Sequence, residues 1–148
     1  VRSSAASDVY KRQDLYRVYA KNCNLSETAF WILYCIRERE EEAFTQREIC
    51  EYWFYTPQTV NSALKNMTEE GLLTLRAEEG NRKNKRIYLT EKGKETVDRI
   101  VVPLMEAERR ALAAVGEQEE EVFLRTMKKH TELFRGEIVK LTEGAEPI

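Results

Sequence analysis

Residues 56–73 read TPQTVNSALKNMTEEGLL, and this stretch predicts the helix around which the rest of the chain can be arranged. Thr56 is a favoured N-cap, and Pro57 follows it at the first helical position, where its missing N–H leaves no helical hydrogen bond unmade. Gly71 is a favoured residue just after a helix, because it readily adopts the left-handed conformation that ends one. We therefore expect a helix that begins after Thr56 and ends before Gly71.

This predicted helix has one apolar face and one polar face. Four apolar residues recur at helical spacing and should face the core, namely Val60, Ala63, Leu64 and Met67. The opposite face carries amide and hydroxyl groups and one lysine, on Gln58, Asn61, Ser62 and Lys65. Gln and Asn can form paired hydrogen bonds with adenine, Ser can bond bases or phosphates, and Lys neutralises a phosphate. The pattern favours a DNA-recognition helix over the alternative, which is an ordinary solvent-exposed polar face.

A basic hairpin is predicted directly after this helix. Residues 73–76 and 86–89 alternate apolar and polar side chains, as strands do, and the stretch between them contains the turn signal Gly80-Asn81. We expect residues 77–85 to form a long basic tip, since four cations crowd its end and the start of the second strand: Arg82, Lys83, Lys85 and Arg86. Such a run is usually only a solvated loop. Its position after a polar-faced helix predicts a shared DNA-facing surface instead, with the helix in the major groove.

Three helices are expected before residue 56. Residues 14–22 read as a helix with its apolar residues on one side. Ser26 is an N-cap for the next helix, in which residues 29–36 are apolar on every side, as in a central, buried helix. Thr45 and Glu48 have the T-x-x-E spacing of a capping box, which starts a short third helix.

Two helices are expected after the hairpin. Thr90 should cap a long helix that Pro103 bends, and its apolar face is formed by Val97, Ile100, Val101 and Leu104, continuing through Ala111, Leu112 and Val115. Gly116 is expected to end this helix. The last helix should span residues 118–141, with a stripe formed by Phe123, Met127, His130, Phe134 and Leu141. A histidine on such a stripe is more often a core or interface residue than a ligand.

Composition excludes several classes of protein. The 148 residues are 42% hydrophobic and 34% charged, with a net charge of −2, as in a globular domain that is not uniformly basic. No apolar run approaches the roughly 20 residues that span a bilayer, and no secretion signal is recognisable, so we expect a cytoplasmic protein with no membrane partner. Three cysteines without a CxxC pair, and a single histidine, predict reduced thiols, no metal and no cofactor. The sequence has no nucleophile and base at a catalytic spacing, so we do not expect an enzyme.

From residue 14 onward, the chain resembles the multiple-antibiotic-resistance regulator (MarR) family of bacterial winged-helix repressors. The resemblance lies in TQREICEYW (45–53), TPQTVNSALKNMTEEGLL (56–73), GNRKNKRIYLTEKGKE (80–95) and VVPLMEAE (101–108), and IYLTEKGKE is its most specific part. It implies an obligate homodimer whose terminal helices interlock and whose two recognition helices enter successive major grooves of a pseudo-palindromic operator. By position, it implies DNA contacts from Thr45, Gln46, Gln58, Thr59, Asn61, Ser62, Lys65, Arg82, Lys83 and Lys85.

Two positions depart from the family pattern. The family's wing motif is Asp-x-Arg, whereas Asn81, Arg82 and Lys83 stand here, which puts the salt bridge within the wing in doubt. Lys83 would also make a point-charge contact in place of a planar guanidinium. Phe54 occupies a turn position often held by glycine, so the local backbone is expected to differ.

The expected fold class is mainly α with a small two-stranded β-wing. Residues 1–13, VRSSAASDVYKRQ, look foreign to the rest of the chain and resemble a translated adapter, so we exclude them from the expected fold. The remaining boundaries place N-terminal dimerisation and core helices at 14–42, a winged helix-turn-helix DNA-binding region at 43–95 and C-terminal dimerisation helices at 96–148.

The function expected from these observations is that of a sequence-specific transcriptional regulator, taken to be a repressor. It would bind double-stranded DNA as a homodimer and be released by a small aromatic or amphipathic effector. The aromatic residues at 52–55, with Phe30, Trp31 and Tyr34, could line an effector pocket, although core packing explains them equally well. Two alternatives stay open: a winged-helix module for protein–protein contact, and a thiol-based redox sensor that uses Cys23, which lies near tyrosines in sequence. Cys50 is expected to be buried and inert.

Overall fold

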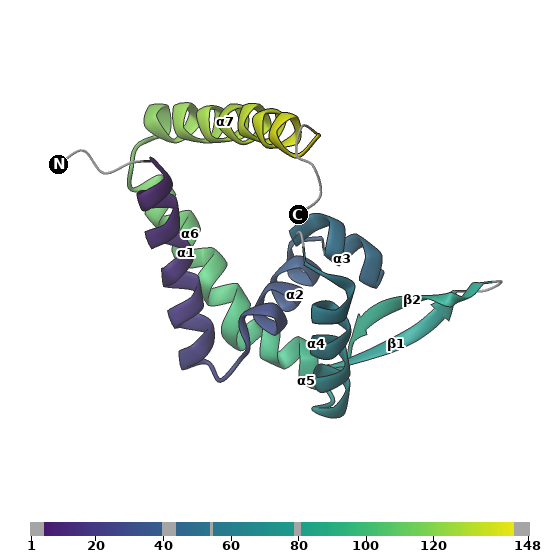
Figure 1. Ribbon diagram of the computed structural model, residues 1–148. Helices are drawn as coiled ribbons and strands as arrows, with labels where there is room; N and C mark the ends of the chain where they lie inside the picture. Colours follow the sequence, from purple (N-terminus) through teal and green to yellow (C-terminus); the bar gives the residue numbers. More distant parts are fainter. Residues whose placement is uncertain (1–4, 40–43, 54, 79–80, 144–148) are drawn as a thin grey trace. The chain divides into compact units, whose positions relative to one another are not determined.

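The computed structural model describes residues 5–39, 44–53, 55–78 and 81–143 (Figure 1). Its elements in chain order are α1 (Ala5–Asn22), α2 (Glu27–Glu38), α3 (Gln46–Trp53), α4 (Pro57–Glu69), β1 (Leu73–Glu78), β2 (Asn81–Leu89), α5 (Glu91–Thr96), a π-helical turn (Val97–Val101), α6 (Val102–Ala113) and α7 (Glu117–Glu143). The predicted fold class, helical with one two-stranded sheet, is confirmed. No helix in these described ranges has the length and apolar character that a membrane span requires.

The chain divides into two compact units, Val1–Leu104 and Met105–Ile148. Helix α2 lies at the centre of the first unit, where it contacts α1, α4 and the π-helical turn. Its side chains Phe30, Ile32 and Leu33 are completely buried, and its predicted N-cap is present, with the Ala29 N–H donating to Ser26 Oγ at 3.2 Å. The prediction of a central, buried helix is confirmed.

Helix α1 begins at Ala5, so the predicted start at residue 14 is wrong. Residues 5–13 contain neither proline nor glycine, and nothing in their local sequence stops the helix from extending toward the N-terminus. At its other end the helix is tied to the core, because Tyr19 donates a hydrogen bond to the Ile100 carbonyl at 2.8 Å and Ala20 is buried against Phe30 and Ile100.

Helix α4 has the predicted ends and the predicted buried face. Thr56 caps it by accepting the Thr59 N–H at 3.2 Å, and the chain leaves it through Gly71, whose φ of +72° is left-handed. The residues of its apolar face are all buried: Val60, Ala63, Leu64 and Met67. They pack in the first unit, where α4 contacts α2, α3 and β1.

The hairpin is paired further toward its tip than predicted. Leu73 pairs with Leu89 and Leu75 with Ile87, as the alternation predicted, but pairing continues through Ala77–Lys85 to Glu78–Asn81. The prediction of a long basic tip between two short strands is therefore wrong. Backbone groups make the ladder, so polar and charged side chains can continue a strand beyond the core, and a register shift at Ala77/Glu78 accommodates the extra residues of β2.

A close approach joins the end of α4 to the start of α5. Thr90 Oγ donates to the Gly71 carbonyl at 2.6 Å and accepts the Gly93 N–H at 3.0 Å, which confirms the predicted N-cap. Gly93 is buried, and a Cβ added to it would lie 1.9 Å from the Leu72 carbonyl oxygen. Only glycine fits there, so α5 is seated directly on the chain that leaves α4.

The long helix after Thr90 is interrupted at a different place from the expected bend. The irregularity is the π-helical turn Val97–Val101, which precedes Pro103, and the Val102 N–H bonds to the Val97 carbonyl across it. Within this turn Val97, Ile100 and Val101 are buried. Since proline donates no N–H to its own turn, a wider turn just before it loses little regular hydrogen bonding.

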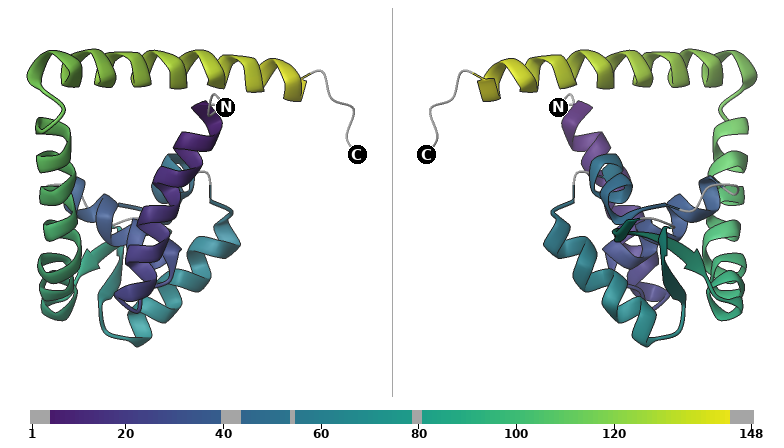
Figure 2. Two further views of the ribbon diagram at one scale, coloured as in Figure 1. Left: turned by 90° about the vertical axis from the view of Figure 1, so that its left-hand side faces the viewer. Right: turned by 90° about the vertical axis from the view of Figure 1, so that its right-hand side faces the viewer.

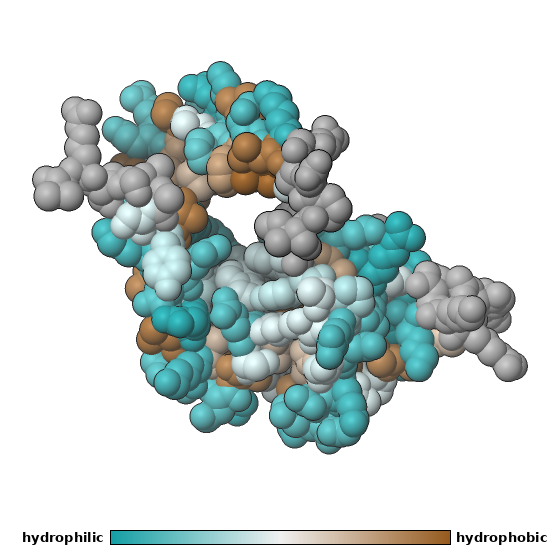
Figure 3. Space-filling model, viewed as in Figure 1, coloured by the Kyte–Doolittle hydropathy of each residue, from teal (hydrophilic) through white to brown (hydrophobic). Residues whose placement is uncertain are grey.

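The second unit holds most of α6 and the 27-residue helix α7, which follows Gly116, the predicted break, at φ +109°. Figure 2 shows α7 as one unbroken helix. Hydrophobic side chains are exposed along it among hydrophilic ones (Figure 3), including Val122, Phe123, Leu124, Leu133, Phe134, Ile138, Val139 and Leu141. His130 is exposed as well and stacks on Phe134, with 6.0 Å between ring centroids.

Candidate nucleic-acid interface

The outward face of α4 presents hydrogen-bonding side chains to solvent. All five residues predicted to contact DNA from this helix are exposed: Gln58, Thr59, Asn61, Ser62 and Lys65. Thr59 is partly engaged within the helix, since its hydroxyl lies 2.8 Å from the Thr56 hydroxyl. The amides of Gln58 and Asn61 offer both donors and acceptors from a helix whose opposite face is fixed in the core.

Gln46 connects the two helices of the helix-turn-helix. Its side-chain Nε2 donates to the Pro57 carbonyl at 3.0 Å, and the residue is half-buried. This contact holds the first residue of α3 against the first residue of α4. Gln46 was predicted to approach phosphate; the structure gives it a positioning contact beside the outward face.

Thr45 was also predicted to approach phosphate, and its surroundings give it a different role. It is 6% exposed, and its N–H and hydroxyl both donate to one Glu48 carboxylate oxygen, at 2.7 and 2.8 Å. The Glu48 N–H returns a bond to Thr45 Oγ at 3.3 Å, which completes the predicted capping box. Thr45 therefore starts α3 and offers no free donor to a ligand.

The capping box also joins α3 to the hairpin. Thr45 makes an antiparallel backbone bridge with Arg86, and the Ile87 N–H donates to the Phe44 carbonyl at 2.8 Å. The hydrogen bond from the Thr45 backbone N–H is the main cause of a lowered pKa for Glu48, and the Arg86 charge adds to the effect. The Glu48 carboxylate thus lies where it stabilises both the helix start and a cation of β2.

Strand pairing divides the hairpin cations between two faces. Arg86 is opposite Arg76, and strand alternation turns both away from the face of Leu75 and Ile87. Lys85 is exposed on the other face, opposite Ala77. The hairpin cations that the structure describes therefore do not all share one face. The side chains of Arg82 and Lys83, like that of Asn81, lie outside the described side chains, and their predicted contacts stay predictions.

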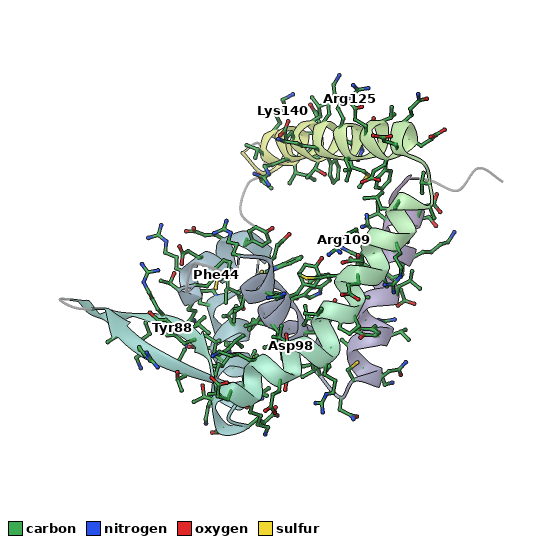
Figure 4. All side chains as sticks on the ribbon, turned by 180° about the vertical axis from the view of Figure 1, so that it is seen from behind. Phe44, Tyr88, Asp98, Arg109, Arg125 and Lys140 are labelled. Carbon is green, nitrogen blue, oxygen red and sulfur yellow. The ribbon has the colours of Figure 1, made fainter. Side chains whose placement is uncertain are left out.

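Arg76 is a cation that the predicted site did not include. Its guanidinium lies over the ring of Tyr88, 4.8 Å from the centroid, on the outward face of the hairpin (Figure 4 labels Tyr88). Like charges directly opposite each other destabilise a strand pair, and the Glu48 carboxylate offsets part of this repulsion at Arg86. The signal was available in the sequence, because alternation places residue 76 on the same face as residue 86.

The aromatic residues considered for an effector pocket pack on one another. Trp31 is the hub, with ring centroids 4.4 Å from Trp53, 5.0 Å from Tyr16 and 5.3 Å from Tyr34. The Trp53 indole N–H donates to Cys35 Sγ, which links α3 to α2. These contacts favour the core-packing interpretation for the residues they join. Phe54, at the turn position where the backbone was expected to differ from the family pattern, lies outside the described residues.

The thiols differ in their surroundings. Burial raises the pKa of Cys35 to about 11, and burial also raises the pKa of Cys50, which is half-buried, so the expectation of a buried Cys50 is wrong. Cys23 is half-buried in the cluster that contains Tyr16 and Tyr19. Nowhere in the described part of the chain do three His, Cys, Asp or Glu side chains gather as metal ligands.

Residues 24–83, which contain α2, α3, α4 and most of the hairpin, match the model of the MarR family. No curated protein sequence matches the chain.

Solved structures resemble the whole chain. A MarR-family transcriptional regulator from Listeria monocytogenes, complexed with 26mer DNA, has a TM-score of 0.78 at 21% identity and covers 100% of this chain and 99% of its own. NMB1585, a MarR-family regulator from Neisseria meningitidis, has a TM-score of 0.76 at 21% identity over 91% of this chain and 94% of its own. The MepR–DNA complex from S. aureus has a TM-score of 0.74 at 16% identity and covers 90% of this chain and 99% of its own. Likeness at these identities establishes the fold.

Proposed function

Because residues 24–83 match the MarR family and the chain has the fold of MarR-family regulators, we propose that this protein is a transcriptional regulator that binds duplex DNA. In this proposal α4 is the recognition helix and the β1–β2 hairpin is the wing. Two of the three similar structures described above are DNA complexes, which supports the assignment.

The observation that carries the proposal is the outward face of α4. Gln58, Asn61 and Ser62 place uncharged hydrogen-bonding groups in solvent on a helix whose other face is buried. Amide side chains held on a rigid support suit the edges of bases in the major groove, where adenine offers one donor and one acceptor side by side. We assign base reading to these three residues.

Phosphate contacts fall to the cations around them. We assign this role to Lys65 on α4 and to Arg82, Lys83 and Lys85 on the wing, with Arg76 added from the structure. Thr59, near the helix start, is the further candidate for a backbone contact. Gln46 supports the surface by holding α3 to α4, and Thr45 drops out of the contact set because both its donors bond Glu48.

We propose that the active form is a homodimer that acts as a repressor and releases DNA when a small effector binds. The exposed apolar side chains of α7 support self-association, because contiguous apolar surface of this kind marks an interaction site. The dimerisation helices would then lie at 14–42 and 96–148, flanking the DNA-binding region at 43–95. Two recognition helices would read half-sites about 10 base pairs apart. The effector would act by favouring a conformation in which that spacing is lost.

The test begins with selection of bound duplexes from a random library, followed by fluorescence anisotropy on the recovered sequence. Asn61→Ala should weaken binding to that sequence by about 1–3 kcal/mol and relax the preference at one base position. Asn66→Ala is the matched control, because Asn66 is an exposed asparagine nearer the C-terminal end of the same helix, away from the end that reads bases in such domains.

An Asn61→Ala protein with unchanged affinity and unchanged base preference would remove α4 from the contact surface. Binding that is indifferent to both sequence and salt would instead favour the protein–protein module, since phosphate contacts impose a steep dependence on salt.

A further inference from the structure

The outward face of α4 carries an anion as well as a cation. Residues 58, 62, 65 and 69 follow one another at spacings of four, three and four, which places them on one side of the helix. Within α4, Lys65 and Glu69 are the whole complement of charged residues. Their side chains are both exposed, and Lys65 Nζ lies 3.9 Å from Glu69 Oε1.

This pair makes the net charge of α4 zero. A second pair of opposite charges follows at the C-terminal end of the helix. Glu70 is the C-cap residue, and Lys92 Nζ donates to the Glu70 carbonyl at 2.6 Å. A phosphate several ångströms away is attracted by the ammonium and repelled by the carboxylate at nearly equal distance, within one Debye length of both. The side-chain charges of α4 therefore add little net attraction to DNA at a distance.

We propose that Glu69 is a specificity-determining residue, because it offsets the charge of Lys65, weakens the attraction of α4 to phosphate and leaves most of the binding by α4 to its base-reading groups. The inference rests on the proposed function. Attraction to phosphate, which is the same on every sequence, then comes mainly from the hairpin cations. Affinity from α4 then depends on whether Gln58, Asn61 and Ser62 find matching base edges, which widens the gap between operator and other DNA.

The experiment measures binding of the full-length protein to the selected duplex and to a scrambled duplex at several KCl concentrations. Glu69→Gln should strengthen binding to the scrambled duplex severalfold at low salt and lower the ratio of the two affinities. It should also steepen the logarithmic salt dependence by about 0.9 for each added phosphate contact, or about 1.8 for a dimer. Lys65→Gln should make the salt dependence shallower by a similar amount.

Two further variants isolate the charge balance. Lys65→Gln combined with Glu69→Gln restores a neutral helix, so its salt dependence should return to that of the wild type. Glu121→Gln is the matched control, since Glu121 forms an exposed i,i+4 pair with Arg125 at 4.0 Å on α7 and changes the net charge of the protein equally.

The inference is overturned if Glu69→Gln behaves like Glu121→Gln, or if the double variant keeps the steepened salt dependence. In either case, loss of selected-site binding in Asn61→Ala would leave the proposed function standing. A wild-type protein that binds neither duplex at any salt concentration would overturn the proposed function, and this inference with it.

Discussion

Helices α4 and α7 both carry an apolar face in sequence, yet only α4 has that face covered within the chain. Val60 and Leu64 of α4 are 0% and 2% exposed, whereas Phe123, Phe134 and Leu141 of α7 are 41%, 57% and 70% exposed. Helix α4 is therefore complete in one chain, and its polar face is the part left for a ligand. Helix α7 has an apolar surface that remains to be covered, which is why we assign it to self-association.

The largest expected effect tests the buried apolar face of α4. Leu64→Ala should lower the free energy of unfolding by about 2–5 kcal/mol, because it removes buried methyl groups and leaves a cavity under α4. Urea denaturation followed by circular dichroism measures it. Leu141→Ala is the control, and any loss it causes should depend on protein concentration. If Leu141→Ala lowered the free energy of unfolding by a similar amount at every protein concentration, the apolar faces of α4 and α7 would not differ as described.

A second prediction tests the exposed apolar stripe of α7. Phe134→Asp places a charge on the α7 stripe and should weaken self-association by at least about 2 kcal/mol, as for a central aromatic residue of an interface. Sedimentation equilibrium measures the change. Arg125→Asp serves as the control and should stay associated, because Arg125 precedes Phe134 by nine residues and so lies on the opposite side of α7 (Figure 4 labels Arg125). A Phe134→Asp protein of undiminished association would show that this stripe is not the contact surface.

The smallest expected effect concerns the start of α3. Because the folded pKa of Glu48 is lowered, its carboxylate adds stability that is complete above the unfolded pKa and is lost as pH falls through the folded value. Glu48→Gln keeps the capping geometry but removes the charge, so it should cost about 0.3–1 kcal/mol at neutral pH and nothing in acid. Thermal unfolding across pH checks this, with Glu51→Gln on the same helix as control. A loss that persists unchanged in acid would contradict the assignment.

Helix α4 could be predicted from sequence because its determinants are local. Thr56, Pro57 and Gly71 act within one turn of the helix ends, and the helical period alone separates the buried face from the exposed one. The same locality explains the correct capping box at Thr45 and Glu48. It does not extend to function, because the burial of Thr45 depends on the bridge from β2, which is distant in sequence.

The hairpin and the first helix were predicted less well, for related reasons. Strand pairing beyond the core is made by backbone groups, so the charged residues of β2 carried no signal that pairing would reach Asn81. The hairpin and the polar face of α4 were expected to share one surface, whereas the alternation of a strand places Lys85 and Arg86 on opposite faces of the hairpin. For residues 5–13, the absence of a stop signal mattered more than their unusual composition.

The π-helical turn at Val97–Val101 also changes which later residues can share a helical face with Val97 and Ile100. In a regular helix the face of Val97 and Ile100 would return at Ala111 and Val115. A turn of this kind accommodates one extra residue, which rotates everything after it by about 100°. Such a position can gain or lose a single residue in evolution without unfolding the helix. Each such event would change which side chains after the turn share a face with Val97 and Ile100, while the buried residues of the turn itself could stay in place.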